Sequence, residues 1–279
     1  MARLVGFIAN RPDLCNRFAA SERRVLTTHN PQGTPWGWGV GFFQSADVLL
    51  KRRPLDERRE LALSDMIADV RSDLLVAHVR RGTVGAFRTA NTHPFRYQHW
   101  LFAQTGTLDG FGALHRRLYD SLPGFLQRSV RGETDGEHLF HLFLSFLHDA
   151  GRLDSLVVPP DECCAALRAT RALVDRMGRE EGHDVSQLNL LLACPDYLVA
   201  VRGGAKMAYR MLEGRADFEP LYDEQGPEKL LMPDLEPCRL AVVASDFDGA
   251  EVPEAWTEVA EDAMIVFTRT DAPTTVRTS

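Results

Sequence analysis

The sequence predicts an α+β fold in which sheets stack face to face and helices cover them. Strands and helices occur in blocks along the 279 residues and do not alternate strictly, as a doubly wound parallel sheet would require. A segment at 133–151 is apolar around most of a helical circumference, which is typical of a buried helix. With 44% apolar residues, the chain is long enough for one large domain.

The first half of the chain is expected to contain mostly strands. Glycines and aromatics fill "PWGWGVGFF" (35–43), which together with 47–55 predicts a hairpin whose backbone lies close to its neighbours. Helical spacing predicts a helix over 61–72, and another helix is expected soon after residue 108. The expected strands are apolar runs bounded by turn signals: 3–9, 35–43, 47–55, 73–81 and 100–108.

The second half begins with helices. Thr134 or Asp135 can cap the buried helix and Gly151 can end it, while 161–182 has the spacing of a surface helix. The final "TDAPTTVRTS" (270–279) is expected to be disordered. Further strands are expected at 187–193, 197–203, 239–245 and 263–269.

Composition argues against several classes of function. A net charge of -7 without a basic cluster gives no footprint for nucleic acid. The longest apolar runs are far shorter than the roughly 20 residues that span a bilayer, and no signal segment opens the chain, so we expect a cytoplasmic protein. The five cysteines are mostly far apart in the sequence and are interpreted as structural thiols. His138, His141 and His148 share a predicted helix, but no second group of ligands in the sequence would complete a metal site with them. No cofactor is predicted.

Five separated stretches together resemble one family: "MARLVGF", "GWGVGF", "HVRRGTVG" with "NTHPF" behind it, "FAQTGTL" and "GETDGEHLF". Their order and separation are similar to those of the glutaminase domain of class II glutamine amidotransferases, which are N-terminal-nucleophile hydrolases. The small stand-alone members are closest in length. The resemblance implies a four-layer αββα sandwich and a single glutaminase-like domain over 1–269.

The resemblance also identifies a missing nucleophile. Family members normally begin Met-Cys, and the exposed Cys attacks the glutamine side-chain amide while its own α-amino group acts as the base. Here Ala2 keeps the amine but has no atom able to form a thioester. The family's oxyanion Asn is replaced by Thr105, although Gly106 still offers its backbone N–H. Two losses at one reaction centre favour natural loss of activity over an engineered trap.

The amino-acid clamp is expected to survive. By resemblance, Arg80 grips the substrate α-carboxylate with a bidentate fork, and Asp135 pairs with the α-ammonium group. Without the surrounding motifs, the same two residues would read as a structural ion pair. Thr83, Trp38 and His93 are three further substrate-binding candidates, and each also has a structural alternative. Thr83 could cap the local backbone, Trp38 could pack in the core and His93 could fix a loop.

Three functions remain open at this point. The first is a glutaminase-like pseudoenzyme that binds glutamine or a γ-glutamyl-like amino acid and acts in sensing, binding or regulating a partner. The second is an active amide or γ-glutamyl hydrolase in which the Ala2 amine activates a water. The third is a scaffold with a relic pocket. The sequence leaves the oligomeric state open.

Overall fold

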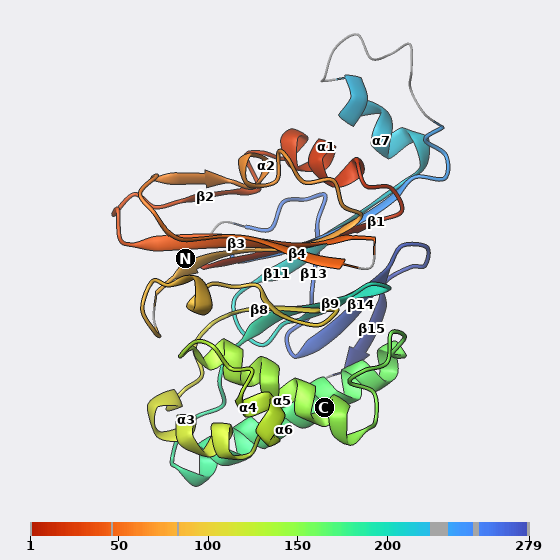
Figure 1. Cartoon of the computed structure of the whole chain (residues 1–279). Coiled ribbons are helices and arrows are strands. Elements are labelled where there is room, and N and C mark those ends of the chain that lie inside the picture. The colour runs from red at the N-terminus through yellow and green to blue at the C-terminus, as the bar shows by residue number, and fades with distance from the viewer. Residues whose placement is uncertain (1, 46, 83, 224–233, 248–250, 278–279) are drawn as a thin grey trace.

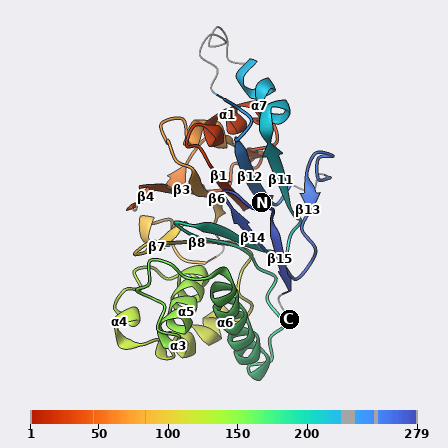
Figure 2. The same cartoon turned by 90° about the vertical axis from the view of Figure 1, so that its right-hand side faces the viewer.

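The computed structural model describes residues 2–45, 47–82, 84–223, 234–247 and 251–277. Two antiparallel sheets stack face to face, and helices cover both outer faces (Figure 1). The predicted four-layer αββα sandwich is confirmed. The same layers appear edge-on in Figure 2, with α1 and α7 on one outer face and α3 to α6 on the other.

The first sheet has seven strands in the order β13-β11-β12-β1-β6-β3-β4, so the N-terminal strand lies at its centre. Every pairing in it is antiparallel, and Leu4 of β1 lies opposite His78 of β6. Its strands are β1 (Arg3–Ala9), β3 (Trp36–Gln44), β4 (Asp47–Asp56), β6 (Leu74–Arg81), β11 (Met207–Glu213), β12 (Arg239–Ser245) and β13 (Thr257–Glu258).

The second sheet has six strands in the order β15-β14-β10-β9-β8-β7, again all antiparallel. Its strands are β7 (Phe95–Tyr97), β8 (Trp100–Thr105), β9 (Asn189–Cys194), β10 (Tyr197–Val201), β14 (Ala263–Thr268) and β15 (Thr274–Arg277). A separate two-stranded sheet pairs β2 (Thr27–His29) with β5 (Glu60–Ala62).

The helices form two groups (Figure 1). Above the seven-stranded sheet lie α1 (Leu14–Ser21), α2 (Leu63–Met66) and α7 (Gly214–Asp223). Below the six-stranded sheet lie α3 (Phe111–Asp120), α4 (Gly124–Gln127), α5 (Asp135–Asp149) and α6 (Pro160–Glu180), and a short 3-10 turn, η1 (Thr89–Asn91), precedes β7. None of the described helices is both long and apolar enough to cross a membrane.

Three apolar layers hold the sandwich together, and β1 shows how one strand serves two of them. Val5 and Phe7 point toward the upper helices, whereas Leu4 and Ile8 point into the gap between the sheets. This alternation follows from the two-residue period of a strand. Gly6 allows close contact, because a Cβ there would lie 2.8 Å from the Leu198 side chain across the gap. A third layer packs α5 and α6 on the second sheet.

Helix α5 is buried as predicted, and its start is well capped. The Thr134 hydroxyl accepts a hydrogen bond from the Glu137 backbone N–H at 3.4 Å. The Glu137 carboxylate in turn accepts from the backbone N–H groups of Arg131 (2.8 Å) and Gly132 (2.6 Å). The first contact satisfies one of the N–H groups that a helix start otherwise leaves unpaired, and the other two fasten the preceding loop to the first turn of α5.

Two local predictions were wrong. The helix expected over 61–72 is only the single turn Leu63–Met66, because residues 60–62 pair with β2 and the backbone turns back toward β6 at Ile67. The tail at 270–279 is not disordered throughout, since Thr274–Arg277 forms β15 on the edge of the second sheet. Its side chains are mostly exposed, so the apolar pattern that marks a strand is missing.

Candidate functional site

A cavity of about 240 Å³ opens where β1 begins, β6 and β8 end and α5 begins. The sandwich brings these four segments together although they are far apart in the sequence. The cavity is lined by Ala2, His78, Arg80, Arg81, Val84, His93, Gln104, Thr105, Gly106, Thr107, Thr134 and Asp135.

Ala2 lines this cavity and directly precedes β1. Because Leu4 faces the gap between the sheets, the two-residue period of the strand places Ala2 on the same face. A methyl group therefore stands beside the polar walls of the cavity. This group offers neither a nucleophile nor a hydrogen-bond donor.

Arg80 is almost fully buried and is held by its own loop. Its guanidinium donates to the backbone oxygens of Val84 (2.6 Å), Gly85 (2.9 Å) and Ala86 (3.0 Å), and it lies 5.0 Å from the centre of the Phe87 ring. These contacts use three of the five N–H donors of the guanidinium. Arg80 thus shapes the cavity wall, and two donors remain for a ligand.

Asp135 is also buried, at the first residue of α5. Its Oδ2 accepts from the Leu108 backbone N–H at 2.8 Å and from Gln104 Nε2 at 3.1 Å. Burial raises the pKa of Asp135 above its usual value, although these hydrogen bonds oppose the shift. No direct ion pair joins Arg80 to Asp135 in the described structure, so neither charge is neutralised by contact with the other.

Two histidines form the inner wall. His78 and His93 are buried, and their ring centres are 4.5 Å apart. The ring centre of Phe95 lies 4.4 Å from that of His93. Burial, aided by Arg80, lowers the pKa of His78 to about 3. Burial is the main cause that lowers the pKa of His93 well below its usual value, and the nearby His78, Arg80 and Arg52 act in the same direction. Both imidazoles are therefore neutral near pH 7.

Thr105 and Gly106 close the cavity at the end of β8. Gly106 has φ +92°, and a Cβ there would lie 2.3 Å from the Gln187 backbone oxygen, so only glycine fits. Thr105 and Gly106 line the same cavity as Ala2.

The sequence candidates separate clearly. Ala2, Arg80, His93, Asp135 and the Thr105–Gly106 pair all line the cavity. Trp38 does not: its side chain packs among the upper-layer core residues, and its indole N–H donates to Asp56 Oδ2 at 2.9 Å. Thr83 lies outside the described residues.

Sequence reasoning undervalued three lining residues. Arg81, the last residue of β6, is half-buried and lines the cavity. His78 and Gln104 sit inside the motifs "HVRR" and "FAQTG", but nothing in the sequence showed that both would be buried there. The strand period indicated a place for His78, because His78 and Arg80 are two residues apart on β6 and therefore point to the same face of the sheet.

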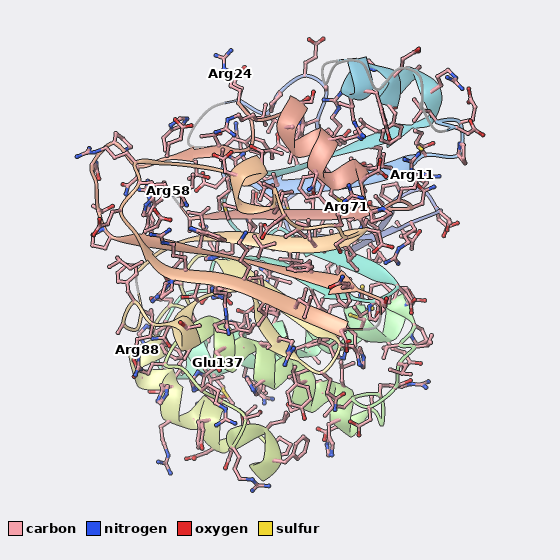
Figure 3. All side chains as sticks on the ribbon, turned by 45° about the horizontal axis from the view of Figure 1, so that its top comes forward. Arg11, Arg24, Arg58, Arg71, Arg88 and Glu137 are labelled. Carbon is pink, nitrogen blue, oxygen red and sulfur yellow. The ribbon has the colours of Figure 1, made fainter. Side chains whose placement is uncertain are left out.

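The start of α5 is pinned to the loop beside the cavity. Asn91 is fully buried, donates to the Ala86 oxygen at 3.0 Å and accepts from the Glu133 N–H at 2.9 Å. Arg88 also pairs with Glu133, and Arg88 and Glu137 mark this end of the helix in Figure 3. These contacts fasten the loop to the start of the helix.

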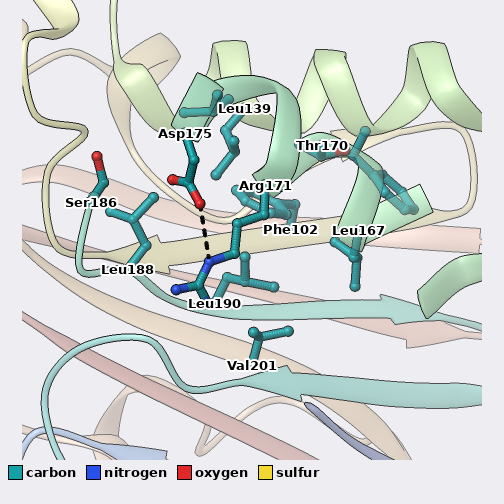
Figure 4. A pocket seen from close by; sticks show the side chains of 12 residues that line it. Phe102, Leu139, Leu167, Thr170, Arg171, Asp175, Ser186, Leu188, Leu190 and Val201 are labelled. Carbon is teal, nitrogen blue, oxygen red and sulfur yellow. Dashed lines mark ion pairs between the residues drawn. The ribbon is translucent and has the colours of Figure 1, made fainter. Parts of the chain in front are cut away.

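A second cavity is too small for a substrate. It holds about 40 Å³ between α5, α6 and the second sheet, room for one or a few water molecules. Its walls are mainly apolar, and an ion pair between Arg171 and Asp175 stands at its edge (Figure 4). Within the described ranges, no three His, Cys, Asp or Glu side chains gather as a metal site would require.

Comparisons with known proteins agree with this architecture. The protein named "Probable glutamine amidotransferase DUG3" of Saccharomyces cerevisiae is 35% identical over 89 residues, which are 32% of this chain and 25% of that protein. The gamma-glutamyl-hercynylcysteine sulfoxide hydrolase of Mycobacterium tuberculosis is 36% identical over 74 residues, 26% of this chain and 32% of that protein. The chain thus spans about a third or less of these relatives.

A solved structure and a family profile extend the likeness to the whole chain. The glutamine aminotransferase class-II domain protein of Silicibacter pomeroyi superimposes with a TM-score of 0.60 at 18% identity, covering 99% of both chains. This shows the shared N-terminal-nucleophile hydrolase fold. The profile of the class II glutamine amidotransferases matches residues 1–279. Because that match spans the entire sequence, the protein belongs to the class II glutamine amidotransferases.

Proposed function

We propose that the cavity binds glutamine or a γ-glutamyl-like amino acid without forming a thioester, and that the protein is inactive as a glutaminase. One observation carries this proposal: Ala2, Arg80, Thr105 and Asp135 line the same cavity. Covalent catalysis needs a nucleophilic atom at position 2, and a methyl group has none. The oxyanion side is weakened as well, since a threonine hydroxyl replaces an amide donor.

The ligand is held by its charged ends. Its α-carboxylate meets the two N–H groups that Arg80 does not spend on its loop, together with Arg81, whose buried Nε has no hydrogen-bond partner among the described residues. The carboxylate of Asp135 attracts the α-ammonium group. Burial of Arg80 and Asp135 strengthens the Coulombic attraction of both side chains for the charged ends of the ligand.

Such a pocket would serve in sensing or regulation. A protein that binds an amino acid but releases no ammonia changes nothing chemically, so its output must be a change in its own conformation or in its affinity for a protein partner. The loop and helix start that form the wall through Arg80 and Asn91 provide an element that a ligand can stabilise.

Titration calorimetry with L-glutamine tests the proposal. We expect binding at millimolar or lower concentration, lost in both Arg80→Ala and Asp135→Ala. Arg116→Ala is the matched control, because Arg116 forms an exposed pair with Asp120 on α3, away from the cavity. If no amino acid or γ-glutamyl dipeptide binds, a scaffold with a relic pocket is the better description.

A second candidate is an amide or γ-glutamyl hydrolase in which the Ala2 amine activates a water. The name of the Mycobacterium tuberculosis relative favours it, since that protein is called a γ-glutamyl hydrolase. Intact-mass measurement shows whether Met1 is removed, which this chemistry requires. Ammonia or amine release that stops when the N-terminus is chemically blocked would support the hydrolase over the binding protein.

A further inference from the structure

A third cavity, of about 440 Å³, opens beside the start of β1. Its volume falls within the range of roughly 300–1,000 Å³ that is common for sites of small molecules, and it exceeds that of the cavity beside Ala2. Three segments build its wall: the first residue of β1, the chain that leads into and along β2, and the loop after β12. The lining residues are Arg3, Arg24, Val25, Thr27, His29, Phe247, Glu251 and Pro253.

The third cavity and the Ala2 cavity lie on either side of the start of β1. Successive residues of a strand point to opposite faces, so Arg3 points with Val5 toward the upper helices, whereas Ala2 points toward the gap between the sheets. Arg81, which lines the Ala2 cavity, donates to the His29 backbone oxygen at 3.2 Å and so joins the two walls. A molecule in the third cavity would therefore contact the residue that directly follows Ala2.

Arg3 places a buried positive charge in the wall of the third cavity. Its side chain is almost fully buried, and its guanidinium donates to the backbone oxygens of Thr27 (3.0 Å) and Val25 (2.6 Å). The guanidinium carbon also lies 5.7 Å from the centre of the Phe247 ring. These contacts fix the position of the charge before any ligand arrives, which lowers the entropy cost of binding an anion.

Arg24 adds a second positive charge to the wall. It is exposed (Figure 3) and forms no ion pair with a described residue. Its sequence neighbour Arg23, in contrast, pairs with Asp65 and does not line the cavity. Glu251 is the only carboxylate among the described lining residues, so the wall contains two arginines and one glutamate. The charge of this wall favours an anion, although the whole chain has a net charge of -7.

We propose that the third cavity is a binding site for a small organic carboxylate. The carboxylate pairs with the Arg24 guanidinium in the field of the buried Arg3, and the apolar body of the molecule packs on Val25, Phe247 and Pro253. A few fixed charges beside apolar side chains are typical of small-molecule sites. The site goes beyond the one proposed for glutamine, because the residues that line the two cavities do not overlap.

A matched pair of probes tests the charge requirement on the full chain. N-acetyl-L-leucine has a carboxylate and an apolar side chain but no α-ammonium group, and N-acetyl-L-leucinamide is its neutral counterpart. We expect the acid to saturate the protein at about millimolar concentration and the amide to bind about tenfold or more weakly. In ¹⁵N NMR spectra, the backbone amides of Thr27, His29 and Phe247 should shift. Equal affinities, no saturation, or shifts confined to the residues of the Ala2 cavity would overturn the inference.

Arg24→Gln and Arg23→Gln form a matched pair of substitutions. Both side chains are exposed, so neither change should disturb the fold. Arg24→Gln should weaken binding of N-acetyl-L-leucine about fivefold, the upper end for an exposed ion pair, whereas Arg23→Gln should leave the affinity unchanged. Added salt should weaken binding to the unaltered chain, because it screens exposed charges. If Arg24→Gln binds the acid as tightly as the unaltered chain, the inference is wrong.

Two γ-glutamyl compounds identify the source of the carboxylate. L-γ-glutamylglycine ends in a carboxylate, and L-γ-glutamylethylamide lacks it. If Arg24→Gln weakens the dipeptide to the level of the ethylamide, the carboxylate belongs to a ligand whose glutamyl group lies in the Ala2 cavity, and this source alone rests on the proposed function. If Arg24→Gln weakens only N-acetyl-L-leucine, the ligand is a separate molecule. Either result supports the site. Binding of neither γ-glutamyl compound would count against the proposed function alone, since N-acetyl-L-leucine tests the third cavity by itself.

Discussion

Gln104 Nε2 donates a 3.1 Å hydrogen bond to Asp135 Oδ2, and this contact joins the end of β8 to the first turn of α5. It links two layers of the sandwich at the wall of the cavity. The same carboxylate holds the Leu108 backbone N–H, so the turn after β8 depends on it as well. Asp135 therefore has a structural role in addition to any part in ligand binding. The structural role can be measured as the pH dependence of the unfolding free energy.

Asp135→Asn tests the electrostatic cost of this buried carboxylate. Because burial raises the folded-state pKa of Asp135, the folded protein binds the proton more tightly than the unfolded chain. Stability from this group is therefore complete below the unfolded pKa of about 3.8 and falls as pH rises through the folded pKa. Relative to the unaltered chain, the urea-measured unfolding free energy of Asp135→Asn should rise across that window. Asp149→Asn, at the exposed end of α5, should show no such trend.

A pair of tryptophans permits a second comparison. Trp38 donates to the Asp56 carboxylate and Trp36 to the Arg58 backbone oxygen, and both rings are buried. Replacing either by Phe should cost about 1–3 kcal/mol of unfolding free energy at pH 7, because the hydrogen bond of a buried indole N–H is lost.

The stability costs of Trp38→Phe and Trp36→Phe should respond differently to acid pH. Burial alone would raise the pKa of Asp56, but hydrogen bonds from Arg58 and Trp38 lower it below the usual 3.8. The stabilisation is thus present above about pH 4 and is lost as pH falls toward the folded pKa. The cost of Trp38→Phe should shrink in that range while that of Trp36→Phe stays constant. Parallel acid denaturation curves for the two variants would show that the indole does not bind the charged form.

The sequence predicted the layers well because strand and helix periods are properties of short segments. The alternation in "RLVGFIA" places Leu4 and Phe7 on opposite faces without reference to the rest of the chain. The helix over 61–72 failed for the opposite reason, since pairing of Glu60–Ala62 with β2 decides where that segment ends, and this pairing spans more than 30 residues.

The candidate site was predicted in part. Motif order placed Arg80 and Asp135 at one cavity, but it could not show that Arg80 would spend three donors on the oxygens of residues 84–86. Nor could it show that Gln104 faces the helix layer, because that depends on Asp135 arriving from a distant segment. Residue identities are local, whereas the partner of each polar atom depends on the whole fold.

Arg80→Lys tests the role of the guanidinium in holding its loop. A lysine ammonium cannot span three separate carbonyl oxygens in a fixed fork, so the wall should open more often. Hydrogen bonds from a charged group contribute about 1.5–3 kcal/mol each, and loss of one should speed local amide exchange about tenfold to a hundredfold. The reporters are the N–H groups of Arg88, Asn91 and Thr92, which are bonded within this segment.

The control for Arg80→Lys is the same substitution at the next residue, Arg81. Arg81→Lys should leave these amides unchanged, because Arg81 donates to the His29 oxygen on another segment. Hydrogen exchange read by mass spectrometry or NMR distinguishes the two variants. Equal protection in Arg80→Lys and the unaltered chain would mean that Asn91 and the Arg88–Glu133 pair hold the wall without the guanidinium.

If the protein is inactive as proposed, glutaminase activity should require two changes among the residues that line the cavity. Ala2→Cys supplies a nucleophile, but Thr105 still offers only a short hydroxyl where a donor to the oxyanion is needed. Loss of one such donor typically lowers the rate about 10²- to 10³-fold. Ala2→Cys combined with Thr105→Asn should therefore release ammonia from glutamine at least about a hundredfold faster than Ala2→Cys alone, with Thr105→Asn alone inactive. Robust turnover by the single Cys variant would show that Gly106 and the remaining wall already stabilise the oxyanion, and that the missing sulfur is the only defect.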